Sequence, residues 1–102
     1  MEVGGNVLVL VTYDVRTTTA VGRKRLLKVA KICLNYGQRV QNSVFECVVD
    51  SEQFKALKRE LKEVVCTKED SLRFYQLGNR YRGKVEHVGT KEVIDLEGPL
   101  IF

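Results

Sequence analysis

The stretch Val7-Leu8-Val9-Leu10-Val11-Thr12-Tyr13-Asp14 decides the fold of this 102-residue chain. Its first five residues are aliphatic and a polar segment follows, which is typical of a buried strand that ends in a loop. Because every position from Val7 to Val11 is apolar, both faces of the strand require burial. A central strand is therefore predicted, with Asp14 at its carboxyl end.

The segments that follow predict a helix and then a hairpin. Polar residues from Arg16 to Ala20 suit a loop, and helical spacing of apolar residues begins near Val21. Gly37 is expected to stop that helix at its C-terminus. Val40 to Val49 is rich in β-formers, and Asn42-Ser43 in its middle predicts a tight turn between two short strands. One bulged strand is the alternative.

A second helix and a last strand complete the pattern. Asp50 and Ser51 can cap the helix, in which apolar residues recur at spacings of three, four and three: Phe54, Leu57, Leu61 and Val64. Leu72 to Leu77 predicts a strand that opens into the basic loop from Gly78 to Lys84. The order β-α-β-β-α-β predicts an α+β, ferredoxin-like domain over residues 1–84, with four antiparallel strands and both helices on one face of the sheet.

The face of the sheet without helices predicts a homodimer. Val44 and Val48 add apolar surface to that face, so a second copy is expected to pack there, sheet against sheet. Residues 85–102 are expected to form a C-terminal strand and tail: Val85 to Gly89 alternates like an edge strand, and the apolar end Pro99 to Phe102 is expected to dock on the partner. Docking on its own subunit is the alternative.

The composition favours a partner that is a polyanion. Lys and Arg outnumber Asp and Glu by 17 to 13, and the net charge of +4 fits nucleic acid. The three cysteines have no C-x-x-C spacing and are interpreted as reduced core residues, and His87 is assigned no role. No apolar run is long enough to span a bilayer, so no membrane partner and a cytoplasmic location are expected.

Asp14 is the strongest candidate for a carboxylate that takes part in chemistry. Phosphate-binding glycine loops, His and Cys clusters, and nucleophile elbows are missing from the sequence. If the two first strands of a dimer meet near a two-fold axis, one Asp14 per chain supplies two carboxylates, a ligand set that Mg²⁺ accepts. Such an ion can activate water against a phosphodiester without a histidine base. Several basic residues are candidate phosphate contacts: Arg16, Arg25, Lys28, Lys31, Arg39, Arg80 and Arg82.

The residues also resemble a known family. The segments that carry the likeness are Val11-Thr12-Tyr13-Asp14-Val15, Tyr36-Gly37-Gln38-Arg39-Val40-Gln41-Asn42-Ser43-Val44-Phe45-Glu46-Cys47 and Phe74-Tyr75-Gln76-Leu77-Gly78. Together they resemble the CRISPR-associated protein two family, over essentially the whole chain. One departure is the loop Arg16-Thr17-Thr18-Thr19, where many members have a proline and further acidic residues.

The resemblance implies a ferredoxin-like homodimer that cleaves RNA or double-stranded DNA with a metal ion. It implies that Asp14 is the Mg²⁺ ligand, and that four further residues match positions around the active site: Tyr13, Arg39, Ser43 and Phe45. Arg25, Lys28 and Lys31 match a basic row for nucleic acid. The family is also described as the partner of the CRISPR integrase during spacer acquisition.

Three functions are therefore considered. The first is a Mg²⁺-dependent endonuclease at the Asp14 pair. The second is a dimeric scaffold that bridges integrase subunits and binds DNA by its charge without cutting it. The third is a regulatory domain that senses a small molecule, which the topology alone would allow. The choice between DNA and RNA stays open, because phosphate contacts carry no base information.

Overall fold

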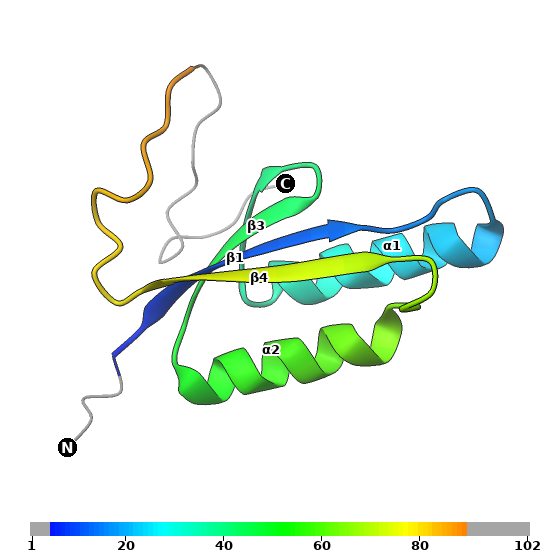
Figure 1. The fold of residues 1–102 in the computed structure, drawn as a ribbon, viewed down its shortest axis with the longest axis horizontal. Helices are drawn as coiled ribbons and strands as arrows, with labels where there is room; N and C mark the ends of the chain where they lie inside the picture. Colours follow the sequence, from blue (N-terminus) through cyan, green and yellow to red (C-terminus); the bar gives the residue numbers. More distant parts are fainter. Residues whose placement is uncertain (1–4, 90–102) are drawn as a thin grey trace.

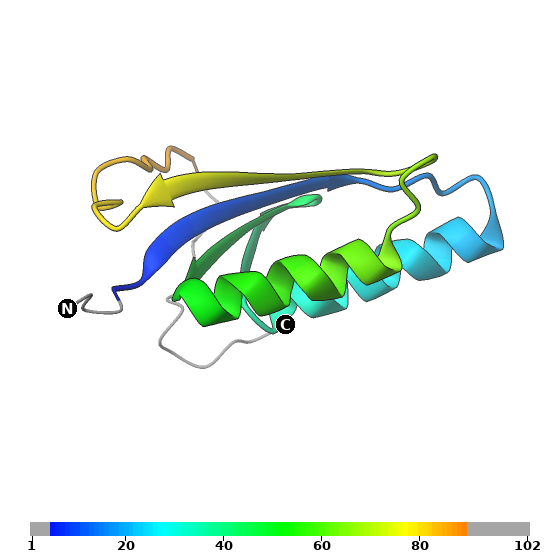
Figure 2. The ribbon, with the colours of Figure 1, turned by 60° about the horizontal axis from the view of Figure 1, so that its bottom comes forward.

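The computed structural model describes residues 5–89, which form one four-stranded sheet and two helices. The elements are β1 (Val7–Asp14), α1 (Ala20–Leu34), β2 (Gly37–Gln41), β3 (Val44–Val49), α2 (Ser51–Val64) and β4 (Ser71–Gly78). The strands are antiparallel in the order β2-β3-β1-β4, and both helices lie on the same side of the sheet (Figures 1 and 2). The predicted ferredoxin-like order is confirmed, with a hairpin at Asn42-Ser43 and not one bulged strand.

The core lies between the sheet and the helices. Alternate residues of β1 and β3, such as Val9, Val11 and Phe45, are 0% exposed, and α2 contributes Leu57 and Leu61, also 0% exposed. Capping defines where α2 begins, because Asp50 accepts a hydrogen bond from the Gln53 amide at 2.8 Å while the Gln53 side chain accepts one from the Asp50 amide at 2.9 Å. The predicted apolar face of this helix is confirmed.

Gly37 has a different role from the predicted helix stop. Helix α1 ends at Leu34 with Asn35 as its cap, and Gly37 is the first residue of β2. A Cβ atom on Gly37 would lie 2.2 Å from the carbonyl oxygen of Glu46 and 2.7 Å from Cα of Cys47. The glycine is needed because β2 approaches β3 too closely here for any side chain, so the prediction that Gly37 stops the helix was wrong.

The buried cysteines are held as thiols. Cys33 and Cys47 are both 0% exposed, and burial raises the pKa of each thiol to about 12. A thiol with that pKa stays protonated and unreactive at neutral pH, so these residues act as small apolar groups. This agrees with their interpretation as reduced core residues.

Different element ends and loops lie at the two ends of the sheet. The end of β1, the start of α1, the end of α2 and the start of β4 meet at one end (Figure 1). The loop from Asn79 to Lys84 lies at the other end. Residues 85–89 form no strand in this single chain, and the rest of the predicted tail lies outside the described residues. Within residues 5–89, neither helix has the length and hydropathy to cross a membrane.

Candidate metal and nucleic-acid site

Asp14 is exposed at the carboxyl end of β1, on the side of the sheet that the helices leave open. The alternation of β1 places Val9, Val11 and Tyr13 toward the helices, so Asp14 points to the opposite side. Among the described residues its carboxylate takes part in no ion pair. An unpaired, exposed carboxylate is a hard oxygen ligand of the kind that Mg²⁺ prefers. The side chain therefore fits the metal that the sequence predicts.

A single chain offers only a partial metal site. Within residues 5–89, no group of three or more His, Cys, Asp or Glu side chains could hold a metal ion. Mg²⁺ commonly takes one or two carboxylates and completes its shell with water and substrate oxygens. One Asp14 from each of two copies would meet that need.

Four predicted site residues lie together, but behind Asp14. The Tyr13 and Phe45 rings stack with centroids 6.1 Å apart, and the Arg39 guanidinium lies 5.2 Å from the Phe45 centroid. The Ser43 carbonyl accepts a hydrogen bond from the Tyr13 amide at 3.1 Å. Tyr13 is 5% exposed and Phe45 0% exposed, both in the core on the helix side.

The active-site role of these residues stays a prediction, and burial bears on it for Tyr13 and Phe45. Burial raises the pKa of the Tyr13 hydroxyl above its ordinary value, so the group holds its proton at neutral pH. The hydroxyl donates to the Asn42 carbonyl at 3.3 Å. Tyr13 and Phe45 lack the exposure that contact with a substrate requires. They support the end of β1 and the β2–β3 turn, whereas Asp14 is exposed on the open side and Arg39 is exposed on β2.

Arg25 does not belong to the basic row in which the sequence placed it. Its guanidinium pairs with Asp70 at 2.8 Å and with Glu69 at 3.1 Å, and its side chain is 14% exposed. The hydrogen bond from Arg25 holds the pKa of the Asp70 carboxyl below its ordinary value. An arginine that is already paired with two carboxylates has little attraction left for phosphate. That Arg25 binds nucleic acid stays a prediction, and in this structure both of its carboxylate partners, Glu69 and Asp70, belong to the chain itself.

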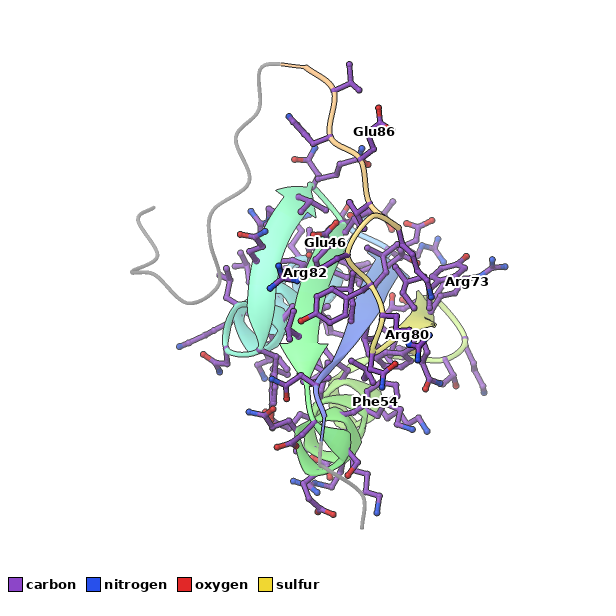
Figure 3. The ribbon with its side chains drawn as sticks, turned by 90° about the vertical axis from the view of Figure 1, so that its left-hand side faces the viewer. Glu46, Phe54, Arg73, Arg80, Arg82 and Glu86 are labelled. Carbon is purple, nitrogen blue, oxygen red and sulfur yellow. The ribbon has the colours of Figure 1, made fainter. Side chains whose placement is uncertain are left out.

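The other basic residues are exposed, at separate places. Arg16 follows Asp14 by two residues, and Lys28 and Lys31 lie on the outer face of α1. Arg80 and Arg82 lie on the loop after β4, at the end of the sheet away from Asp14; Figure 3 looks onto that end. Arg16 is next to the Asp14 end of β1, and Arg39 of β2 lies beside the Tyr13 and Phe45 rings, so the predicted phosphate contacts are spread over separate parts of the structure.

Sequence reasoning missed Arg73. It opposes Thr12 in the β1–β4 ladder while Asp14 opposes Ser71, so Arg73 is the diagonal neighbour of Asp14 on the open side. Its side chain projects outward from β4 (Figure 3) and donates to the Tyr75 hydroxyl at 3.0 Å. No carboxylate pairs with it in the described part of the chain. The alternation of Leu72 and Phe74 with Arg73 was the signal that would have found it.

The open side of the sheet is apolar at its centre. Leu10, Val44 and Val48 are half-buried there, and Tyr75 is 43% exposed. Gln38 opposes Glu46 on the same side, and its Oε1 atom is buried without a hydrogen-bond partner among the described residues. A buried amide oxygen without a partner is uncommon in a complete structure. Both observations fit a surface that another polypeptide covers.

Comparison with known proteins places the chain in a family. The family model described as CRISPR associated protein Cas2 matches residues 7–85. The CRISPR-associated endonuclease Cas2 of Halalkalibacterium halodurans is 64% identical over 95 residues, which cover 93% of this chain and 99% of that protein. The CRISPR-associated endoribonuclease Cas2 of Chlorobaculum tepidum is 59% identical over 95 residues, with coverage of 93% and 99%.

Solved structures agree with this. The crystal structure of Streptococcus pyogenes Cas2 at pH 6.5 matches with a TM-score of 0.71 and 55% identity, covering 80% of this chain and 99% of that chain. A hypothetical protein, TT1823 from Thermus thermophilus, matches with a TM-score of 0.64 and 32% identity, covering 94% and 98%. Fold, motif and sequence identity agree, and the chain belongs to the Cas2 family of CRISPR-associated proteins.

Proposed function

We propose that this chain is a homodimeric, Mg²⁺-dependent endonuclease that hydrolyses phosphodiester bonds of nucleic acid in CRISPR spacer acquisition. The observation that carries the proposal is the exposed Asp14 carboxylate at the end of β1, which forms no ion pair within residues 5–89 and lies beside an apolar sheet face. The names of the two curated relatives, an endonuclease and an endoribonuclease, support a nuclease. Those names differ in substrate, so the proposal covers both DNA and RNA.

Asp14 from each of two copies would hold the ion. When bound, Mg²⁺ supplies a water of lowered pKa and polarises a phosphoryl oxygen. The chain itself contributes position and charge. Arg16 and Arg73 flank Asp14 on neighbouring segments and are the cations best placed to bind phosphate oxygens around it. Tyr13 and Phe45 pack behind β1 and keep the strand end rigid.

The proposal predicts that Asp14→Asn abolishes cleavage. The change removes the charge that binds the ion and keeps the shape of the side chain, so cleavage of double-stranded DNA and RNA should fall by at least about 100-fold. Gel assays with Mg²⁺ and with a chelator measure it. Glu63→Gln, an equal charge change at an exposed position of α2, should cleave like the wild type. Equal cleavage by wild type and Asp14→Asn would remove Asp14 from the site.

A scaffold function is the second candidate, and the placement of the lysines favours it. Lys28 and Lys31 lie on the exposed face of α1, on the opposite side of the sheet from Asp14. Charge on that face can bind DNA without presenting it to Asp14. Reconstituted spacer integration with the integrase separates the two candidates. A scaffold keeps integration in Asp14→Asn and loses it in Lys28→Ala/Lys31→Ala, whereas a nuclease that is required for integration fails in Asp14→Asn.

A further inference from the structure

Asp70, in the loop between α2 and β4, has an unusually complete set of partners. Its side chain is 0% exposed. It accepts hydrogen bonds from Arg25 Nε at 2.8 Å and Arg25 Nη2 at 3.2 Å, from the Cys66 amide at 2.8 Å and from the Arg16 amide at 3.1 Å. Four donors from three separate segments saturate one carboxylate. Asp70 therefore joins the loop after β1, helix α1 and the loop after α2.

The segments that Asp70 joins are the ones that flank Asp14. Arg16 follows Asp14 by two residues, and Ser71, the residue after Asp70, opposes Asp14 in the β1–β4 ladder. The carbonyl group of Arg16 is confined as well, because a Cβ atom on Gly22 would lie 2.0 Å from the Arg16 carbonyl oxygen. The chain leaving Asp14 is thus held by a hydrogen bond on one side and by close packing on the other.

Asp14 itself needs this support. Its carboxylate has no ion pair in residues 5–89, so only the backbone around it sets the direction in which it points. Metal ligands depend on outer groups of this kind for their orientation, and loss of such groups costs about 10–100-fold in metal affinity or activity. Arg25 in turn orients Asp70 through two nitrogen atoms, an arrangement that lysine cannot reproduce.

We propose that Asp70, oriented by Arg25, is a positioning residue for the Asp14 site. It holds the loop 15–19 and the start of β4, and it thereby fixes the Asp14 carboxylate for the metal and Arg16 for phosphate. The inference rests on the proposed nuclease function. It gives Arg25 a role that does not require contact with nucleic acid.

The test compares Asp70→Asn with Glu69→Gln. Both changes remove one carboxylate charge from Arg25, but only Asp70 contacts the Arg16 and Cys66 amides. We expect Asp70→Asn to lower kcat by about 10–100-fold and to raise the Mg²⁺ concentration at half-maximal rate similarly, with KM for nucleic acid within about threefold. Glu69→Gln should stay within about twofold in all three quantities. Amide hydrogen exchange at Arg16 should quicken in Asp70→Asn alone.

Arg25→Lys keeps the test decisive if Asp70→Asn does not fold. Lysine retains the charge but cannot donate to Asp70 from two nitrogen atoms. The Mg²⁺ requirement is therefore expected to rise by about 3–10-fold, less than in Asp70→Asn. A purely structural role would lower the melting temperature and leave the Mg²⁺ requirement of the folded enzyme unchanged. That result in either folded variant overturns the inference. If Asp14→Asn is inactive while Asp70→Asn is normal, the inference alone fails; if Asp14→Asn cleaves normally, the proposed function fails.

Discussion

The position of Arg73 in the β1–β4 ladder makes it a candidate contact for phosphate. It is exposed on the open side of β4, diagonal to Asp14, where such neighbours lie about 7–8 Å apart and their Cβ atoms somewhat closer. A long arginine side chain can reach across that separation, but the two side chains form no ion pair within residues 5–89, so both charges are available to a phosphate placed between them. A metal–oxygen distance of about 2.1 Å and a guanidinium–oxygen distance of about 2.8 Å leave room for one phosphate group.

We therefore predict that Arg73→Ala lowers kcat/KM for cleavage by about 10–100-fold, because a hydrogen bond between charged groups is worth roughly 1.5–3 kcal/mol. Arg59→Ala is the matched control, since Arg59 is an exposed arginine on α2, in the helix layer. Steady-state kinetics with a defined duplex and a defined single strand measure both variants. A loss of the same size in the two variants would point to net charge and not to a contact at the site.

At the scale of elements, the strands and helices were predictable, and the contacts between distant segments were not. The aliphatic run of β1 and the Asp50–Gln53 capping box are local signals, and both led to the correct element. Arg25 resembles Lys28 in any local pattern. It differs only because Asp70, 45 residues away, lies beside it after folding. Gly37 was assigned to a helix end because its close contact with β3 likewise forms only after folding.

Gly37 provides the prediction at this scale. A Cβ would meet two β3 backbone atoms, the Glu46 carbonyl oxygen at 2.2 Å and Cys47 Cα at 2.7 Å, so β2 must move away from β3 to accept a side chain. Gly37→Ala should therefore lower the free energy of unfolding by about 2–3 kcal/mol. Urea unfolding followed by circular dichroism measures it. Gly5→Ala, where a Cβ would meet no atom within 4 Å, should unfold like the wild type. A stable Gly37→Ala protein would mean that the hairpin adapts freely.

At the scale of the whole molecule, the proposed dimer buries a titratable group. Glu46 opposes Leu10 of β1 and Gln38 of β2 on the open side, between Val44 and Val48 of its own strand. Burial already raises the pKa of the Glu46 carboxyl in the single chain, and it forms no ion pair with another described residue. A second sheet packed on this face would remove more water and raise that pKa further.

The sign of the pH effect follows from the raised pKa. Burial penalises the ionised carboxylate, so the cost is present at pH values above the raised pKa and disappears as the pH falls through it. The dimer should therefore tighten from about pH 8 to about pH 5, by up to about tenfold in Kd for each unit by which association raises the pKa of one Glu46. Sedimentation equilibrium measures the Kd. Glu46→Gln should dimerise tightly at every pH, whereas His87→Gln, which removes the one histidine, should keep the wild-type dependence. If Glu46→Gln keeps that dependence as well, another group is being titrated and Glu46 does not lie within the contact between the sheets.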